Sequence, residues 1–177
     1  MTKRCDDDGQ ATEAAIEAIS RTISRLRVLI GRRIISRLAL ANVTPGLELS
    51  HVDVLDAIRR IDGEATVGAI AEQLRIDPSR GSRLVADMVA GGVLYRLASQ
   101  EDGRRSVIEL TELGERLLKE MRDIKDSVIR QAVADWPEED IEVFAALYAR
   151  FVCRFDALLT DNQRRAEGCR SKGGPAP

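Results

Sequence analysis

Arginine and serine side chains are concentrated in two short stretches of this chain. The first stretch, residues 79–83, reads Ser-Arg-Gly-Ser-Arg, and the second is Arg104-Arg105, which comes after Asp102-Gly103. A guanidinium group can donate two hydrogen bonds to a guanine or to a phosphate, and a serine hydroxyl adapts to either partner. The candidate contacts to a nucleic acid are therefore Ser79, Arg80, Ser82, Arg83, Arg104 and Arg105.

The first stretch is predicted to lie at the start of a short helix. Asp77-Pro78 supplies an N-cap residue and a proline suited to the first helical position. At 100° per residue, the apolar positions of residues 79–89 fall on one side and Ser79, Ser82 and Arg83 on the other. A preceding helix over 67–74, capped by Thr66, and a joint at Arg75-Ile76 complete a predicted helix-turn-helix. An outward Arg/Ser face is common on helices and does not by itself indicate DNA binding. The prediction therefore depends on the position of this helix as the second helix of a helix-turn-helix.

The second stretch is predicted to lie at the tip of a β-hairpin. Residues 93–98 and 106–110 have strand-like patterns, and the polar residues 99–105 join them. A ribbon after a helix-turn-helix is a wing, so residues 50–111 are interpreted as a winged helix-turn-helix DNA-binding region. Residues 67–110 contain six arginines and six acids. Because this segment is net neutral, a basic surface requires that the arginines be sorted to one side.

Long helices are predicted on both sides of this region. Residues 11–41 carry isoleucine and leucine at alternating spacings of three and four, as a helix seam does. Helices are also expected from Thr111 to about Ala134 and from Pro137 onward, the last with aromatic residues at the same spacing. We interpret 11–41 and 112–160 as a helical dimerisation region. The expected fold is mainly α with a small β wing, a winged helix-turn-helix homodimer built on its N- and C-terminal helices.

Smaller features complete the chain. Residues 1–10 and 161–177 are polar and are expected to be disordered tails. Ser50 is predicted to cap a helix, with Asp53 at its third position. The first helix also carries six arginines between Arg21 and Arg37, which fit either a solvated face or contacts with DNA phosphates or an anionic ligand.

Composition restricts the class of protein. The net charge is −2, the three cysteines are Cys5, Cys153 and Cys169, and His51 is the one histidine. No run of 18 apolar residues suggests a membrane span, and we expect a cytoplasmic protein. A single histidine and no CxxC pair argue against catalytic triads and zinc sites, so no enzyme, cofactor or metal is expected. Cys153 is expected in the core; a redox role of the cysteines stays open.

The wing and the residues after it resemble a known family. The sequence GGVLYRLASQEDGRRSVIELTELG is similar to the wing of the MarR family of winged-helix transcription regulators. Asp102-Gly103-Arg104 matches the family's Asp-x-Arg, and 110–114 matches its Leu-Thr-x-x-Gly. The resemblance runs from Ser50 through the last helix. The chain lacks the proline often found ahead of the wing aspartate and the reactive cysteine of redox-sensing members, and Trp136 replaces a usual Ser or Thr cap.

The resemblance implies a homodimer that binds a pseudo-palindromic operator on double-stranded DNA, usually as a repressor. It implies that Arg104 enters the minor groove, that Asp102 and Gly103 shape the wing, and that 78–90 is the recognition helix. It also implies release by a small aromatic or anionic ligand. We expect its pocket between the first helix, the Ser50 helix and the Thr111 helix, with His51 and Arg33 as candidate ligand-binding residues. The alternative is a ligand or redox sensor that acts through protein partners without operator binding.

Overall fold

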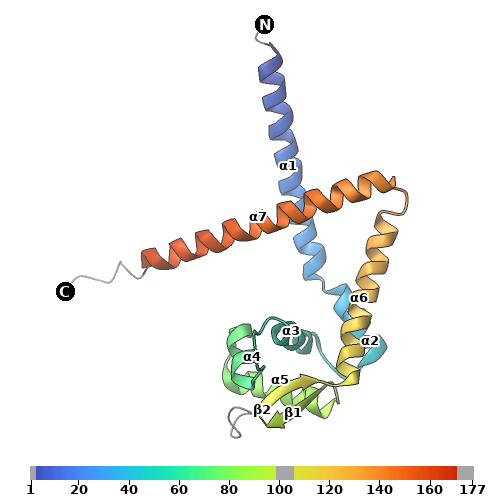
Figure 1. The fold of residues 1–177 in the computed structure, drawn as a ribbon, viewed down its shortest axis with the longest axis vertical. Helices are drawn as coiled ribbons and strands as arrows, with labels where there is room; N and C mark the ends of the chain where they lie inside the picture. Colours follow the sequence, from blue (N-terminus) through green and yellow to red (C-terminus); the bar gives the residue numbers. More distant parts are fainter. Residues whose placement is uncertain (1–2, 99–105, 171–177) are drawn as a thin grey trace, which may run out of the picture. The chain divides into compact units, whose positions relative to one another are not determined.

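A computed structural model describes the backbone of residues 3–98 and 106–170, and the side chains of residues 12–98 and 106–162. The elements are α1 (Lys3–Gly31), α2 (Ile34–Val43), α3 (Leu49–Ile58), α4 (Val67–Leu74), α5 (Pro78–Ala90), β1 (Leu94–Ala98), β2 (Ser106–Leu110), α6 (Glu112–Ala132) and α7 (Glu138–Arg170) (Figure 1). The chain divides into two compact units, Met1–Ser127 and Val128–Pro177, and the division falls within α6. The predicted fold class, mainly helical with a small β wing, is confirmed.

Helices α3, α4 and α5 and the β-hairpin enclose the core of the first unit, the winged-helix lobe. The strands pair antiparallel in a register that runs from Leu94 opposite Leu110 to Ala98 opposite Ser106. The Ile108 N–H donates to the Ala65 carbonyl at 2.7 Å, so the segment before α4 joins the sheet. Within the described residues, no aromatic side chain is among the largest that fill the core: Val52, Val54, Leu55, Ile70, Val85, Met88, Val93, Leu94, Ile108 and Leu117.

Thr111 fixes the passage from the sheet into α6. Its hydroxyl donates to the Gly92 carbonyl at 2.6 Å and accepts a bond from the Gly114 N–H at 3.2 Å. Gly114 is required at this place, because an added Cβ would lie 2.5 Å from the Val93 carbonyl oxygen. The Leu-Thr-x-x-Gly sequence therefore has a structural cause, a capping hydroxyl and a backbone contact that leaves no space for a side chain.

The single helix expected over 11–41 is wrong, since the chain breaks between α1 and α2. Arg33 has φ 51°, in the left-handed region. Its guanidinium binds the Asp53 carboxylate of α3 through Nη2–Oδ1 at 2.8 Å and Nη1–Oδ2 at 3.1 Å. An ion pair with two hydrogen bonds is stronger than one with a single bond, and this pair holds the turn between α1 and α2 against α3. The apolar spacing continues through the break, which is why periodicity alone missed it.

Three further boundaries differ from expectation. Residues 3–10 belong to α1 and residues 161–170 belong to α7, so much of both expected tails is helical. Helix α3 begins earlier than expected, with Glu48 rather than Ser50 as N-cap. The reason is that the His51 ring reaches back and its Nδ1 accepts the Glu48 backbone N–H at 2.9 Å.

In the second unit, α7 begins after Pro137 with three acids in its first turn, as its sequence predicts. Aromatic rings contact one another along it: Trp136 meets Phe144 edge to face at 5.4 Å, and Phe144 stacks on Tyr148 at 5.5 Å. Cys153 is exposed, contrary to the expected core position. Among the described residues, the helices include none that is long and apolar enough to cross a membrane.

Candidate nucleic-acid interface

Asp77 sets the start of α5. Its carboxylate accepts the Ser79 backbone N–H at 2.8 Å and also the Ser79 hydroxyl. These bonds stabilise the charged form of the carboxylate and hold the pKa of Asp77 below its usual value. The bond from the Ser79 hydroxyl has the larger effect, and the bond from the Ser79 N–H has the next largest. The Ser79 hydroxyl proton is thus engaged in capping, and the oxygen of that group remains available as an acceptor. The sequence predicted Asp77 as the N-cap residue but did not predict its hydrogen bond with the Ser79 hydroxyl.

Helix α5 separates a buried face from a polar face as the helical wheel predicts. Gly81, Val85 and Met88 are buried, whereas Arg80, Ser82 and Arg83 are exposed. Within the part of the chain that the structure describes, neither arginine enters an ion pair. Two free guanidinium groups therefore lie beside a helix N-terminus, where the helix dipole also favours anions.

Helix α4 determines the orientation of this face. Thr66 caps α4 by accepting the Ala69 N–H at 3.2 Å, and Arg75 ends it in the left-handed conformation with φ 53°. A Cβ added at Gly81 would lie 2.8 Å from the Ala71 Cβ, so α5 crosses α4 in close contact at these two small residues. This close crossing turns the opposite face of α5 outward.

The four candidate residues of the wing, Asp102, Gly103, Arg104 and Arg105, lie outside the described residues. They belong to the connection between Ala98 and Ser106, which form the last pair of the β-ladder. Their proposed contacts stay predictions.

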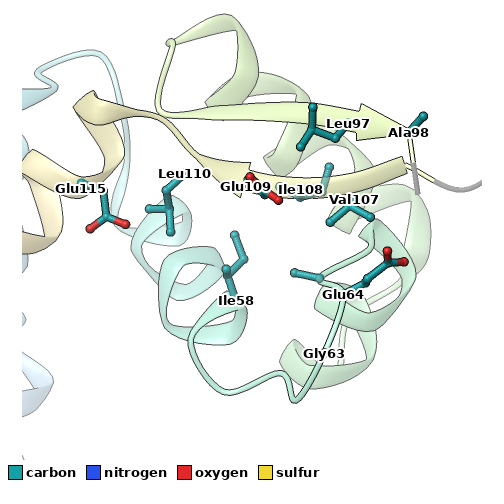
Figure 2. A pocket seen from close by; sticks show the side chains of 11 residues that line it. Ile58, Gly63, Glu64, Leu97, Ala98, Val107, Ile108, Glu109, Leu110 and Glu115 are labelled. Carbon is teal, nitrogen blue, oxygen red and sulfur yellow. The ribbon is translucent and has the colours of Figure 1, made fainter. Parts of the chain in front are cut away.

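The far side of the lobe has a different character. A hollow of about 910 Å³ lies between the end of α3, the segment before α4 and the hairpin, and Figure 2 shows Ile58 and Leu110 reaching into it. Its charged residues are Glu64, Glu109 and Glu115. The Tyr95 hydroxyl donates to Glu109 at 2.5 Å, and this bond raises the pKa of Tyr95. Carboxylates repel phosphates, so this hollow does not suit DNA.

The two candidate ligand residues already have structural partners. Arg33 is paired with Asp53, and His51 Nδ1 accepts the Glu48 N–H. His51 lines a second hollow of about 680 Å³, which α5 borders in place of the first helix expected there. Thr44 also lines that hollow and was not singled out from sequence, since nothing around it has a motif.

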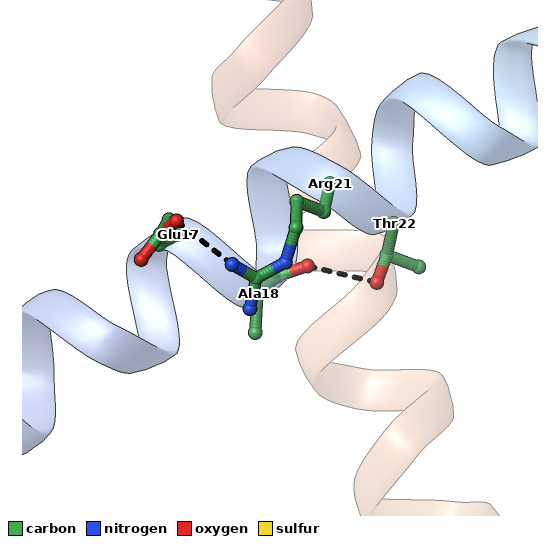
Figure 3. Close-up of polar contacts among 4 residues, drawn as sticks. All are labelled: Glu17, Ala18, Arg21 and Thr22. Carbon is green, nitrogen blue, oxygen red and sulfur yellow. Dashed lines mark hydrogen bonds and ion pairs between the residues drawn. The ribbon is translucent and has the colours of Figure 1, made fainter.

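The arginines of the first helix mostly behave as a solvated face. Arg21 pairs with Glu17 one turn earlier at 2.8 Å, and the Thr22 hydroxyl donates to the Ala18 carbonyl at 2.8 Å (Figure 3). Such exposed pairs contribute little to stability. Arg33 is the exception, because its side chain is 30% exposed and tied to α3.

The chain is similar to several known proteins. A model of the MarR family matches residues 46–105. A Bacillus subtilis (strain 168) protein, named the uncharacterized HTH-type transcriptional regulator YxaD, is 33% identical over 95 residues. That alignment covers 52% of this chain and 66% of the relative, so the match spans just under two thirds of its length.

Solved structures share the fold. A MarR family protein from Bacillus stearothermophilus has a TM-score of 0.64 at 19% identity, covering 81% of this chain and 97% of that one. A MepR–DNA complex from S. aureus has a TM-score of 0.57 at 21% identity, covering 75% and 98%. The family model, the curated relative and the solved structures all point to the MarR family of winged-helix proteins, which this chain resembles.

Proposed function

We propose that the protein is a transcriptional regulator that binds double-stranded DNA. The observation that carries this proposal is the face of α5 with Arg80, Ser82 and Arg83 exposed and the two guanidinium groups free of ion pairs among the described residues. The MepR structure of the same fold is a complex with DNA. In our proposal α5 enters a major groove, where arginine reads guanine and serine adapts to base or phosphate.

We further propose that the protein acts as a homodimer on a pseudo-palindromic operator, as a repressor that a small ligand releases. A row of apolar side chains along α7 is exposed in the single chain, and a second copy would cover it: Val143, Phe144, Leu147, Tyr148, Phe151, Val152, Phe155, Leu158 and Leu159. Two recognition helices about 34 Å apart would then meet successive major grooves. In this scheme the wing residues Arg104 and Arg105 contact the minor groove or the backbone.

The test begins with selection of genomic fragments by the purified protein, followed by gel-shift titration of the selected site. Arg83→Ala should weaken binding about fivefold to a hundredfold if it reads a base, and should relax preference at one position. If it contacts a phosphate, binding should weaken on all sequences and the salt slope should fall by about one. Arg60→Ala, an exposed arginine after α3, is the matched control and should bind as the wild type does.

The alternative function is a sensor that acts through protein partners. Its supporting observation is that residues 67–110 are net neutral. Selection that enriches no sequence, with Arg83→Ala and wild type binding equally, would favour this alternative and remove the operator-binding proposal.

A further inference from the structure

Arg75, at the joint between α4 and α5, has a backbone conformation that favours glycine. Its φ is 53° and its ψ is 43°. The Arg75 N–H donates to the Glu72 carbonyl and the Ile76 N–H donates to the Ala71 carbonyl, each at 3.0 Å. This pair of bonds is a Schellman ending of a helix, and its left-handed position is usually a glycine because a Cβ is strained there. Arginine at this position therefore has a cost to stability that glycine would avoid.

Arg33 has the same left-handed conformation and already has a use for its side chain. Of the described residues other than glycine, Arg33 and Arg75 alone have a positive φ. The Arg33 guanidinium makes two bonds to the Asp53 carboxylate, at 2.8 and 3.1 Å. Such a charge-assisted pair stabilises the fold and offsets the strain of the backbone. An anionic partner is thus a physical reason for arginine at a left-handed position.

Arg75 lacks such a partner in the part of the chain that the structure describes. The residue is exposed, and its side chain enters no ion pair with a described residue. Glu72 and Asp77 are close in sequence, yet neither is paired with the Arg75 guanidinium. The Asp77 carboxylate instead accepts the N–H and the hydroxyl of Ser79. The strain at Arg75 is therefore not offset by a contact within the described chain.

The position of Arg75 in the lobe suggests where its partner is. Only residues 76 and 77 separate Arg75 from Pro78, where α5 begins. In a helix-turn-helix, the first helix crosses the DNA backbone and the second enters the major groove, so the joint between them lies beside the backbone. A cation at this joint is therefore close to phosphates when α5 lies in the groove.

We propose that Arg75 is a further DNA contact, whose guanidinium binds a backbone phosphate beside the groove that α5 enters. This inference rests on the proposed function and extends it to a residue outside α5 and the wing. The phosphate takes the place that the Asp53 carboxylate has beside Arg33. Phosphate contacts position a protein on DNA but do not read its sequence. Arg75 therefore adds affinity on any sequence, whereas Arg80 and Arg83 distinguish bases.

Replacement by glycine should change stability and DNA binding in opposite directions. Arg75→Gly should raise the melting temperature by about 1–4 °C, because glycine removes the strained Cβ. It should weaken DNA binding about three- to tenfold for each copy of Arg75 in contact, at about 0.15 M salt. The slope of log K against log salt should fall by about one for each copy. Thermal unfolding and gel-shift titration at several salt concentrations measure these effects.

Matched variants separate the guanidinium from the backbone. Arg75→Ala removes the charge but keeps a Cβ, so it should weaken DNA binding as glycine does without raising the melting temperature. Arg75→Lys keeps a cation and should retain the salt slope of the wild type. The loss in Arg75→Ala should be equal on the selected site and on a duplex of scrambled sequence. Arg60→Ala is the control and should leave affinity and slope unchanged.

Four results would overturn the inference. The first is wild-type affinity in Arg75→Ala. The second is weak binding in Arg75→Gly alone, since freedom of the backbone would then be the cause. The third is a loss confined to the selected site with an unchanged salt slope, which would indicate contact with a base. The fourth is a salt slope in Arg75→Lys as low as in Arg75→Ala, since charge would then not be the reason.

The wild type separates this inference from the proposed function. A wild type that selects and binds DNA, with Arg75→Ala binding equally tightly, would remove the Arg75 contact and keep the proposed function. A wild type that binds neither the selected nor the scrambled duplex would remove the proposed function, and the contact with it.

Discussion

Apolar side chains are buried in the winged-helix lobe and exposed along α7. In the lobe, Leu55, Ile70, Val85 and Met88 are fully covered. On α7, Phe144 and Leu147 are each 48% exposed and Phe155 is 42% exposed. Five of the six aromatic residues of the chain lie between Trp136 and Phe155, and the sixth is Tyr95 on the wing.

This difference separates two ways of using apolar surface. The lobe buries its aliphatic side chains within its own core. Its outward surface on α5 carries polar and charged side chains. Exposed aromatic side chains in a row instead indicate a surface that another chain covers, because aromatic residues are enriched where interfaces form. The lobe therefore depends on internal packing, whereas α7 fits the association that we propose.

The largest expected effect is on the lobe core. Leu55→Ala should lower the free energy of unfolding by about 2–5 kcal/mol, because a fully buried leucine leaves a cavity. Urea denaturation followed by circular dichroism measures it. Leu97→Ala on the exposed part of the hairpin is the matched control and should change the free energy by less than about 0.5 kcal/mol. Equal costs for the two leucines would contradict a closed core.

The next effect is on association through α7. Phe151→Asp should weaken the proposed dimer about 30-fold or more, since a charge would replace an aromatic anchor worth about 2 kcal/mol or more. Sedimentation equilibrium measures the dissociation constant, with Arg150→Ala as control. An unchanged constant in a folded variant would show that this face of α7 is not the interface.

A third change tests how the lobe orients its polar face. Gly81→Ala should destabilise the protein by about 1–3 kcal/mol, because its Cβ would lie 2.8 Å from the Ala71 Cβ. The double variant with Ala71→Gly should recover part of that loss, because the methyl group then has space. Thermal unfolding of the two single variants and the double variant measures the coupling. Strictly additive losses would mean that the two residues do not meet.

The smallest effect concerns the Asp77 cap. Hydrogen bonds from Ser79 lower the pKa of Asp77 in the folded state from 3.8, so its ionised form contributes stability above that value. This contribution is lost as the pH falls through the lowered pKa. Asp77→Asn keeps the acceptor and removes the charge, so the wild type should be the more stable of the two near neutral pH. That difference should disappear in urea denaturation as the pH falls below the lowered pKa of Asp77. A difference independent of pH would contradict the role of the charge.

Much of the lobe could be predicted from sequence because its signals are local. Asp77-Pro78 marked the start of α5, the wheel separated its faces, and the strand patterns located β1 and β2. Thr111 and Gly114 matched a family pattern, and the structure adds the reason in the hydroxyl bond to Gly92 and the close Val93 carbonyl. The DNA contacts proposed for α5 and the wing stay predictions.

Residues 3–10 and 161–170, parts of the expected tails, were mispredicted for a physical reason. A polar segment without an apolar face has the composition of disorder, and composition alone does not distinguish it from an exposed helix. The structure continues α1 to Lys3 and α7 to Arg170.

By itself the sequence determined the order of helices and strands, the polar face of α5 and the resemblance to a family. These depend on residues within a few positions of one another, where capping, helical spacing and strand alternation act. The tertiary structure alone decided the break at Arg33, the His51 cap on α3 and the hollow that Thr44 and His51 share. Each of these depends on partners brought together by folding, such as Arg33 and Asp53, which lie twenty residues apart. Periodicity in a sequence contains no record of such pairs.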